Sequence, residues 1–147
     1  MLMHTNQLLV AMDAPRFASR TMLHIDPRTG QVTGASAGHV PLLCAHEDGS
    51  HDIYRLPGGP LLGVLPDAEY PQGTFTLDKA TALVMVTDGV VEGPDLTLDA
   101  GLEQTGALAA QALHDGLSAE EIADRVLGAA IALDQLDDLA VVVVRRT

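Results

Sequence analysis

The chain has 147 residues, of which 47% are hydrophobic, so it can bury one substantial core, and its formal net charge is −12. Such a charge repels phosphate backbones, which argues against nucleic-acid binding. A single cysteine excludes an internal disulfide and a cysteine-based zinc site, and no apolar run approaches the roughly 20 residues of a membrane span. Because residues 1–6 show no basic segment leading into an apolar one, no secretory signal is predicted, and a cytoplasmic protein is expected.

The N-terminal segment predicts a short helix over residues 2–13. Leu8, Leu9 and Met12 recur at helical spacing, which indicates one apolar side. Pro15 follows closely and marks the end of this helix.

A β-hairpin is predicted next. Residues 17–26 alternate between apolar and polar, which is typical of a half-buried strand. Asp26-Pro27-Arg28-Thr29-Gly30 is a turn sequence, with proline early and glycine late, and it leads into a second strand over residues 31–36. The residues expected to face the core are Phe17, Thr21, Leu23 and Ile25.

The middle of the chain predicts further strands over residues 40–45, 52–56, 70–77 and 81–87, the first two joined by a turn. The segment 56–67 is rich in proline and glycine, yet it carries several apolar side chains. We therefore expect it to be a loop that packs against the protein.

Two helices and a last strand complete the pattern. The first helix is predicted over residues 102–113, and the second begins at the capping box Ser118-Ala119-Glu120-Glu121. The final strand covers residues 139–145. Many strands, then two helices, then one strand predict an α+β fold with antiparallel sheets in a single domain over residues 1–147. The apolar stripe expected on the second helix is Ile122, Val126, Ala130 and Leu133.

Acidic residues adjoin two of the predicted strands. Asp88-Gly89 directly follows strand 81–87, and Asp137-Asp138 directly precedes strand 139–145. If these strands pair antiparallel, the end of the first lies beside the start of the second. Crowded carboxylates repel one another unless a cation lies between them, and a hard divalent ion prefers oxygen ligands. The first hypothesis is therefore metal-dependent hydrolysis.

Simpler interpretations exist for each of these residues. Asp88-Gly89 alone is a favoured turn pair, and Asp137-Asp138 could be a solvated start of a strand. Neighbours on an extended chain point to opposite faces, so we expect only one of the latter two to bind a given ion. Glu92 is interpreted as a solvated loop residue.

Three other features are interpreted as structural. His39 is expected to close a tight turn after Gly38, and Cys44 to be a small core residue in an apolar strand. Gly58, Gly59 and Gly63 lack the lysine and the helix start of a phosphate-binding loop, so they are expected to allow close packing.

Five motifs occur in a fixed order along the chain. They are Asp26-Pro27-Arg28-Thr29-Gly30, Ser36-Ala37-Gly38-His39, residues 59–67, Thr87-Asp88-Gly89 and Asp137-Asp138-Leu139. In these motifs the chain resembles the SpoIIE/RsbU branch of the PPM-type (protein phosphatase 2C-like) serine/threonine phosphatases, and the resemblance covers the chain from about Asn6 to Arg146.

The resemblance implies an antiparallel β-sandwich flanked by helices, and hydrolysis of phosphoserine or phosphothreonine on a regulatory protein such as an anti-sigma-factor antagonist. It also implies two Mn²⁺ or Mg²⁺ ions. Asp88 matches the downstream aspartate of the family's metal centre, with Gly89 as its neighbour. Asp137 matches the aspartate that completes the shell of the second metal, with Asp138 as its neighbour.

The resemblance is to the C-terminal two-thirds of the family domain. The family's upstream Gly-Asp-Val-Ser-Gly-His-Gly-like metal motif is absent from the sequence, and Asp13 is the only aspartate before Asp26. Two hypotheses follow: a domain with little or no catalysis that acts as a protein-binding module, or a site completed by another polypeptide. An uncovered sheet edge would also favour self-association.

Overall fold

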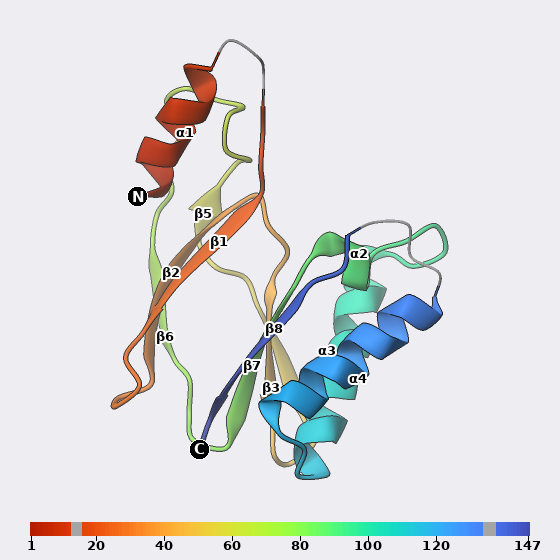
Figure 1. Ribbon diagram of the computed structural model, residues 1–147. Coiled ribbons are helices and arrows are strands. Elements are labelled where there is room, and N and C mark those ends of the chain that lie inside the picture. Colours follow the sequence, from red (N-terminus) through yellow and green to blue (C-terminus); the bar gives the residue numbers. More distant parts are fainter. Residues whose placement is uncertain (13–15, 134–137) are drawn as a thin grey trace. The chain divides into compact units, whose positions relative to one another are not determined.

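The structure is a computed structural model that describes residues 1–12, 16–133 and 138–147 (Figure 1). The described chain divides into two compact units. The first comprises residues 1–39 and 56–76, and the second comprises residues 40–55 and 77–147.

The first unit is a four-stranded sheet with one helix, α1 (Leu2–Val10). Strand β2 (Gln31–Ala37) is central and pairs antiparallel with β1 (Arg20–Ile25) and β6 (Gly73–Thr76). The two-residue strand β5 (Gly58–Gly59) pairs parallel with the end of β2, which the sequence did not predict. The predicted hairpin 17–36 is confirmed, since β1 and β2 are joined by the turn at residues 26–30.

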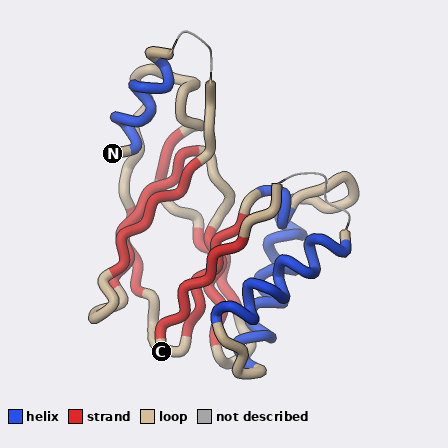
Figure 2. The backbone as a smooth tube through the Cα atoms, in the orientation of Figure 1, coloured by secondary structure: helices blue, strands red, loops and turns tan. Residues whose placement is uncertain are grey.

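The second unit is an antiparallel sheet with helices (Figure 2). Its strands are β3 (Leu42–His46), β4 (His51–Tyr54), β7 (Thr81–Val86) and β8 (Val141–Arg146), in the order β4-β3-β7-β8. The helices are α2 (Asp88–Val91), α3 (Leu98–His114) and α4 (Ala119–Ala132).

The core of the second unit lies between its helices and its sheet. Alternate residues of β3 and β7, such as Leu43 and Val84, are fully buried against the apolar side chains of α3 and α4. The predicted capping box begins α4: the Ser118 N–H donates to a Glu121 carboxylate oxygen at 2.8 Å, and the Glu121 N–H donates to the Ser118 hydroxyl at 3.3 Å. Of the predicted stripe on α4, only Leu133 is wrong, because the helix ends at Ala132 and Leu133 is 56% exposed.

The predicted apolar side of α1 is wrong for Leu8 and Met12 and confirmed for Leu9. Leu2 and Asn6 are buried and Leu9 packs beside them, whereas Leu8 and Met12 are exposed. Phe17 was expected to face the core, but it precedes β1 and is 72% exposed. The apolar spacing of α1 is consistent with either stripe, so contact with the sheet decides which one is buried.

The predicted packing of loop 56–67 is confirmed, and a buried asparagine explains it. Asn6 is fully buried on α1; its side-chain amide donates to the carbonyl oxygen of Leu65 at 2.8 Å, and its carbonyl oxygen accepts the Gly63 N–H at 2.7 Å. Gly63 has φ +85°, and a side chain there would overlap the carbonyl oxygen of Arg16. The loop therefore follows α1 closely, and its own Leu62 is buried in a cluster with Leu2, Ala35 and Ala37.

Asn6→Ala is expected to destabilise the chain by about 2 kcal/mol, because it leaves the Gly63 N–H and the Leu65 carbonyl without their partner. Urea unfolding measures this free energy. Gln7→Ala, at the exposed neighbouring position, serves as the control and should change it by no more than about 0.5 kcal/mol. Equal changes in the free energy of unfolding would show that the Asn6 hydrogen bonds contribute nothing to stability.

Candidate metal-binding site

The sheet of the second unit brings Asp88 near the segment that starts at Asp138. Strands β7 and β8 pair antiparallel along their whole length, with Val86 opposite Val141. Asp88 lies two residues after Val86, and Asp138 lies three residues before Val141. The predicted meeting of a strand end with a strand start is therefore confirmed in the backbone.

Thr87 fixes this junction with three hydrogen bonds. Its N–H donates to the carbonyl oxygen of Ala140 at 3.1 Å. Its hydroxyl donates to the carbonyl oxygen of Asp138 at 2.8 Å and accepts the Ala140 N–H at 2.9 Å. The residue immediately before Asp88 is thus tied to the segment that leads into β8. Sequence reasoning missed Thr87, because its side chain makes no capping bond to α2 and its partners lie more than 50 residues further along the chain.

Asp88 begins the one-turn helix α2, which the sequence did not predict. One carboxylate oxygen of Asp88 accepts the Gly89 N–H at 3.1 Å, and the side chain is exposed. The other end of the turn is anchored, since Val90 and Val91 are buried in the core against α3. Asp88 is therefore held in place by its backbone while its carboxylate remains open to solvent.

The other predicted site residues differ in their exposure, and some of them lie outside the described residues. Asp137 lies outside the described residues, as does Asp13, and the Asp138 side chain is exposed. Gly89 is buried, and the exposed Glu92 ends α2 with its N–H donating to the carbonyl oxygen of Asp88. Across residues 1–12, 16–133 and 138–147, no group of three or more His, Cys, Asp or Glu side chains is arranged to hold a metal ion.

The described residues offer a type of ligand atom that suits a hard divalent cation. Asp88 supplies an exposed carboxylate, and carboxylate oxygens are the protein ligands that Mg²⁺ and Mn²⁺ prefer. They supply too few such donors to enclose an ion by themselves. By itself Asp88 therefore does not make a metal site.

The structural interpretations of His39 and Cys44 agree with their surroundings. His39 closes the turn after Gly38 with its N–H donating to the Ser36 hydroxyl, and its ring Nδ1 is hydrogen-bonded to the Ser19 hydroxyl at 3.0 Å. Cys44 is buried in β3, and burial raises the pKa of its thiol to about 11, so it is protonated at neutral pH.

The comparisons with known proteins identify a family and its fold. Residues 1–147 match the family Stage II sporulation protein E (SpoIIE). No curated protein matches the sequence significantly. In the described part of the chain, no helix is both long and apolar enough to cross a membrane.

Three solved structures illustrate the similarity. The RsbU and RsbW domains of Rv1364c from Mycobacterium tuberculosis are 24% identical with a TM-score of 0.76, over 96% of this chain and 39% of that one. The phosphatase domain of SpoIIE from Bacillus subtilis (Mn presoaked) is 21% identical with a TM-score of 0.65, over 87% of this chain and 56% of that one. RsbX in complex with magnesium is 24% identical with a TM-score of 0.65, over 97% of this chain and 61% of that one.

The chain thus spans less than two thirds of each of these structures. The similarity confirms the predicted fold class, an α+β fold with antiparallel sheets and helices like that of the PP2C-type phosphatase domains.

Proposed function

This chain belongs to the SpoIIE family, in the SpoIIE/RsbU branch of the PPM-type phosphatases, and from that premise we propose that it takes part in metal-dependent hydrolysis of phosphoserine or phosphothreonine on a regulatory protein in the cytoplasm. An anti-sigma-factor antagonist is the kind of substrate that the family resemblance suggests. The RsbW domain present beside RsbU in the Mycobacterium tuberculosis structure supports a regulatory partner.

The observation that carries this proposal is the junction of β7 and β8. Pairing of the two strands and the hydrogen bonds of Thr87 bring Asp88 beside the chain that leads into β8. On this basis Asp88 and Asp137 are the proposed metal ligands, with Gly89 and Asp138 as their neighbours. The proposed ion is Mn²⁺ or Mg²⁺, because SpoIIE from Bacillus subtilis was soaked in manganese and RsbX was solved with magnesium.

When bound, such an ion makes hydroxide available near neutral pH and neutralises the oxygens of the phosphoryl group. The residues of this chain would contribute to hydrolysis by holding the ion. Asp88 offers a carboxylate whose backbone is fixed by α2, and its exposure leaves room for water and for a phosphorylated side chain. Without a cation, the acidic surface of the chain would repel a phosphoryl group.

Two carboxylates leave most coordination positions of Mg²⁺ or Mn²⁺ to water and to other groups. The proposal therefore requires further ligands, from other residues or from a second polypeptide. In their absence the fold would serve as a phosphatase-like module that binds a partner without turnover.

Hydrolysis of a phosphoserine peptide by the chain is expected to require Mn²⁺ and to stop when EDTA is added, because the ion provides both the nucleophile and the charge neutralisation. Phosphate release with Mn²⁺, with Mg²⁺ and with EDTA measures this. Turnover that persists in EDTA would contradict the proposal. Absence of turnover from a chain shown to be folded would favour the binding module, which predicts partner binding that is indifferent to EDTA.

A further inference from the structure

The side chain of Thr87 is used in an unusual way for its position. Thr87 stands directly before α2 with an extended backbone, φ −78° and ψ 159°, where a threonine commonly accepts an N–H of its own helix. Its hydroxyl makes no such bond to residues 88–91 of the described chain. It is bonded instead to the carbonyl oxygen of Asp138 and to the N–H of Ala140, 51 and 53 residues further along. The hydroxyl therefore joins two segments that are far apart in the sequence.

This hydroxyl extends the contact of β7 with β8 beyond regular strand pairing. The last paired residues are Val86 and Val141. One more backbone bond follows, from the Thr87 N–H to the carbonyl oxygen of Ala140 at 3.1 Å. Asp138 lies two residues earlier still, and the Thr87 hydroxyl reaches its carbonyl oxygen at 2.8 Å. Because the same hydroxyl oxygen accepts the Ala140 N–H at 2.9 Å, this short segment is held at both ends.

Thr87 also fixes the start of α2. Its carbonyl oxygen accepts the N–H of Val90 at 3.0 Å, and the carbonyl oxygen of Asp88 accepts the N–H of Glu92 at 2.8 Å. Val90 is buried in the core of the second unit, which anchors this turn. The N–H, the hydroxyl and the carbonyl oxygen of Thr87 thus all have partners. The backbone of Asp88, the next residue, is consequently fixed relative to the chain that leads into β8.

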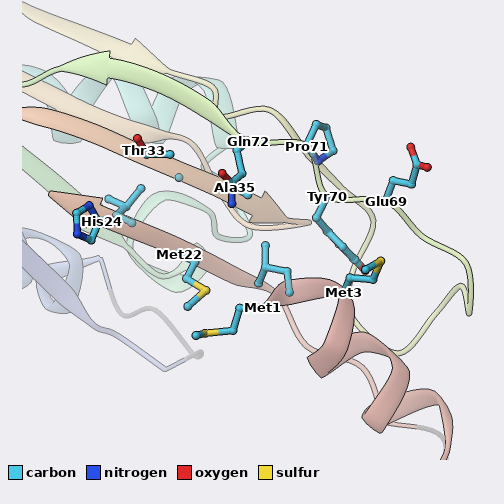
Figure 3. A pocket seen from close by; sticks show the side chains of 13 residues that line it. Met1, Met3, Met22, His24, Thr33, Ala35, Glu69, Tyr70, Pro71 and Gln72 are labelled. Carbon is cyan, nitrogen blue, oxygen red and sulfur yellow. The ribbon is translucent and has the colours of Figure 1, made fainter.

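The hollow of the first unit offers no competing place for a hard cation. A cavity of about 830 Å³ is bounded by the start of α1, by β1 and β2, and by residues 69–72. Figure 3 shows methionine side chains in it, and Glu69 is the one carboxylate among the described residues that line it. Since Mg²⁺ and Mn²⁺ prefer several oxygen ligands, such an ion is expected at the junction of β7 and β8 and not in this hollow.

We propose that Thr87 is a positioning residue for the divalent ion: its hydroxyl holds the backbone of Asp88 against the start of β8 and thereby sets the affinity of the chain for the ion. The inference rests on the proposed function, in which the Asp88 carboxylate binds Mn²⁺ or Mg²⁺. Mg²⁺ demands near-ideal geometry with oxygens at about 2.0–2.1 Å, so a carboxylate whose backbone can shift loses affinity. Groups that orient a metal ligand typically change metal affinity by about 10- to 100-fold when they are removed.

Thr87→Val tests this inference, because valine keeps the branched shape of threonine and loses the hydroxyl. We expect the Mn²⁺ dissociation constant, measured by isothermal titration calorimetry, to rise about tenfold. Thr87→Ser keeps the hydroxyl and should stay within about twofold of the wild-type chain. Asp138 and Ala140 are exposed, so water can replace the lost bonds and the valine variant should fold, which urea unfolding verifies.

Ser118→Ala is the matched control for a loss of stability alone. It removes a hydroxyl that accepts the Glu121 N–H at the start of α4, in the same unit. This part of the chain lies near the other end of β8, since the Arg145 guanidinium donates to the carbonyl oxygen of Leu117 at 3.0 Å. Ser118→Ala should therefore lower stability without changing Mn²⁺ affinity. Equal weakening of Mn²⁺ binding in Ser118→Ala and Thr87→Val would overturn the proposal.

A positioning residue acts through the ligand that it positions. In the Asp88→Asn background, Thr87→Val should therefore change the Mn²⁺ dissociation constant by less than about twofold, because the carboxylate is already gone. An undiminished effect of Thr87→Val in that background would show that Thr87 does not act through Asp88.

Hydrogen exchange of the Ala140 amide gives a readout that needs no metal ion. In the metal-free chain this amide should exchange faster in Thr87→Val than in the wild type or in Thr87→Ser, because its hydroxyl partner is missing. Equal exchange rates in all three would show that the hydroxyl does not hold this segment, and the proposal would be wrong.

Failure of this inference is distinguishable from failure of the proposed function. If Asp88→Asn weakens Mn²⁺ binding and Thr87→Val does not, Asp88 binds the ion but Thr87 does not position it. If the wild-type chain binds Mn²⁺ no more tightly than Asp88→Asn, the proposed site itself is wrong, and the role of Thr87 toward the ion is overturned with it.

Discussion

Asp88→Asn is expected to weaken Mn²⁺ binding by the chain at least about tenfold and to remove any Mn²⁺-dependent hydrolysis. The change takes away the negative charge and keeps the size of the side chain. The amide oxygen of asparagine can still accept the Gly89 N–H, so the first turn of α2 should persist. Isothermal titration calorimetry with Mn²⁺ measures the affinity, and urea unfolding shows whether stability is unchanged.

The control for this change is Asp124→Asn, which removes an exposed carboxylate from α4 in the same unit. It removes one negative charge, as Asp88→Asn does, so a purely electrostatic attraction of Mn²⁺ to the acidic surface would respond equally to both variants. Equal affinities in Asp88→Asn and Asp124→Asn would therefore remove Asp88 from the proposed site.

The same measurement separates the two neighbouring aspartates. If only one of them binds the ion, Asp137→Asn should weaken Mn²⁺ binding as Asp88→Asn does, and Asp138→Asn should have a smaller effect. The carbonyl oxygen of Asp138 accepts the Thr87 hydroxyl, and this backbone bond does not depend on the side chain.

Gly101→Ala is expected to destabilise the second unit by roughly 2 kcal/mol or more, because a Cβ there would overlap the carbonyl oxygen of Val91. Gly101 is buried in the first turn of α3, and the atom that it would displace belongs to the backbone of α2. Since α2 also begins at Asp88, the substitution should weaken Mn²⁺ binding as well as stability.

Gly128→Ala is a matched control on α4, since a Cβ there would meet nothing within 4 Å. It should stabilise the chain by about 0.5 to 1 kcal/mol, because alanine favours a helix over glycine. Urea unfolding of both variants gives the two free energies. A neutral or stabilising effect of Gly101→Ala would show that close contact between α2 and α3 does not require glycine.

Glycine at position 101 illustrates a limit of sequence reasoning. The sequence predicts a helix near this residue and would treat a glycine inside it as a weakness. The reason for the glycine is a contact with Val91, ten residues earlier, which becomes visible only when α2 and α3 are packed.

Local sequence patterns were enough to predict the α+β class, most of the strands, the capping box of α4 and the approach of Asp88 to the start of β8. These features depend on local patterns: apolar stretches of strand length, turn residues, a Ser-x-x-Glu start, and acidic residues next to strands. The family resemblance was likewise carried by short motifs in a fixed order.

The remaining features depend on how the chain packs. Leu8 and Leu9 are equally apolar, yet only the contact of α1 with its sheet leaves the first exposed and the second packed. Asn6 appears in the sequence as an ordinary polar residue, but its partners lie near residue 65 and make it a buried anchor. Side chains whose roles depend on distant partners have no local pattern, and the physical reason is that burial and hydrogen bonding are properties of the packed chain.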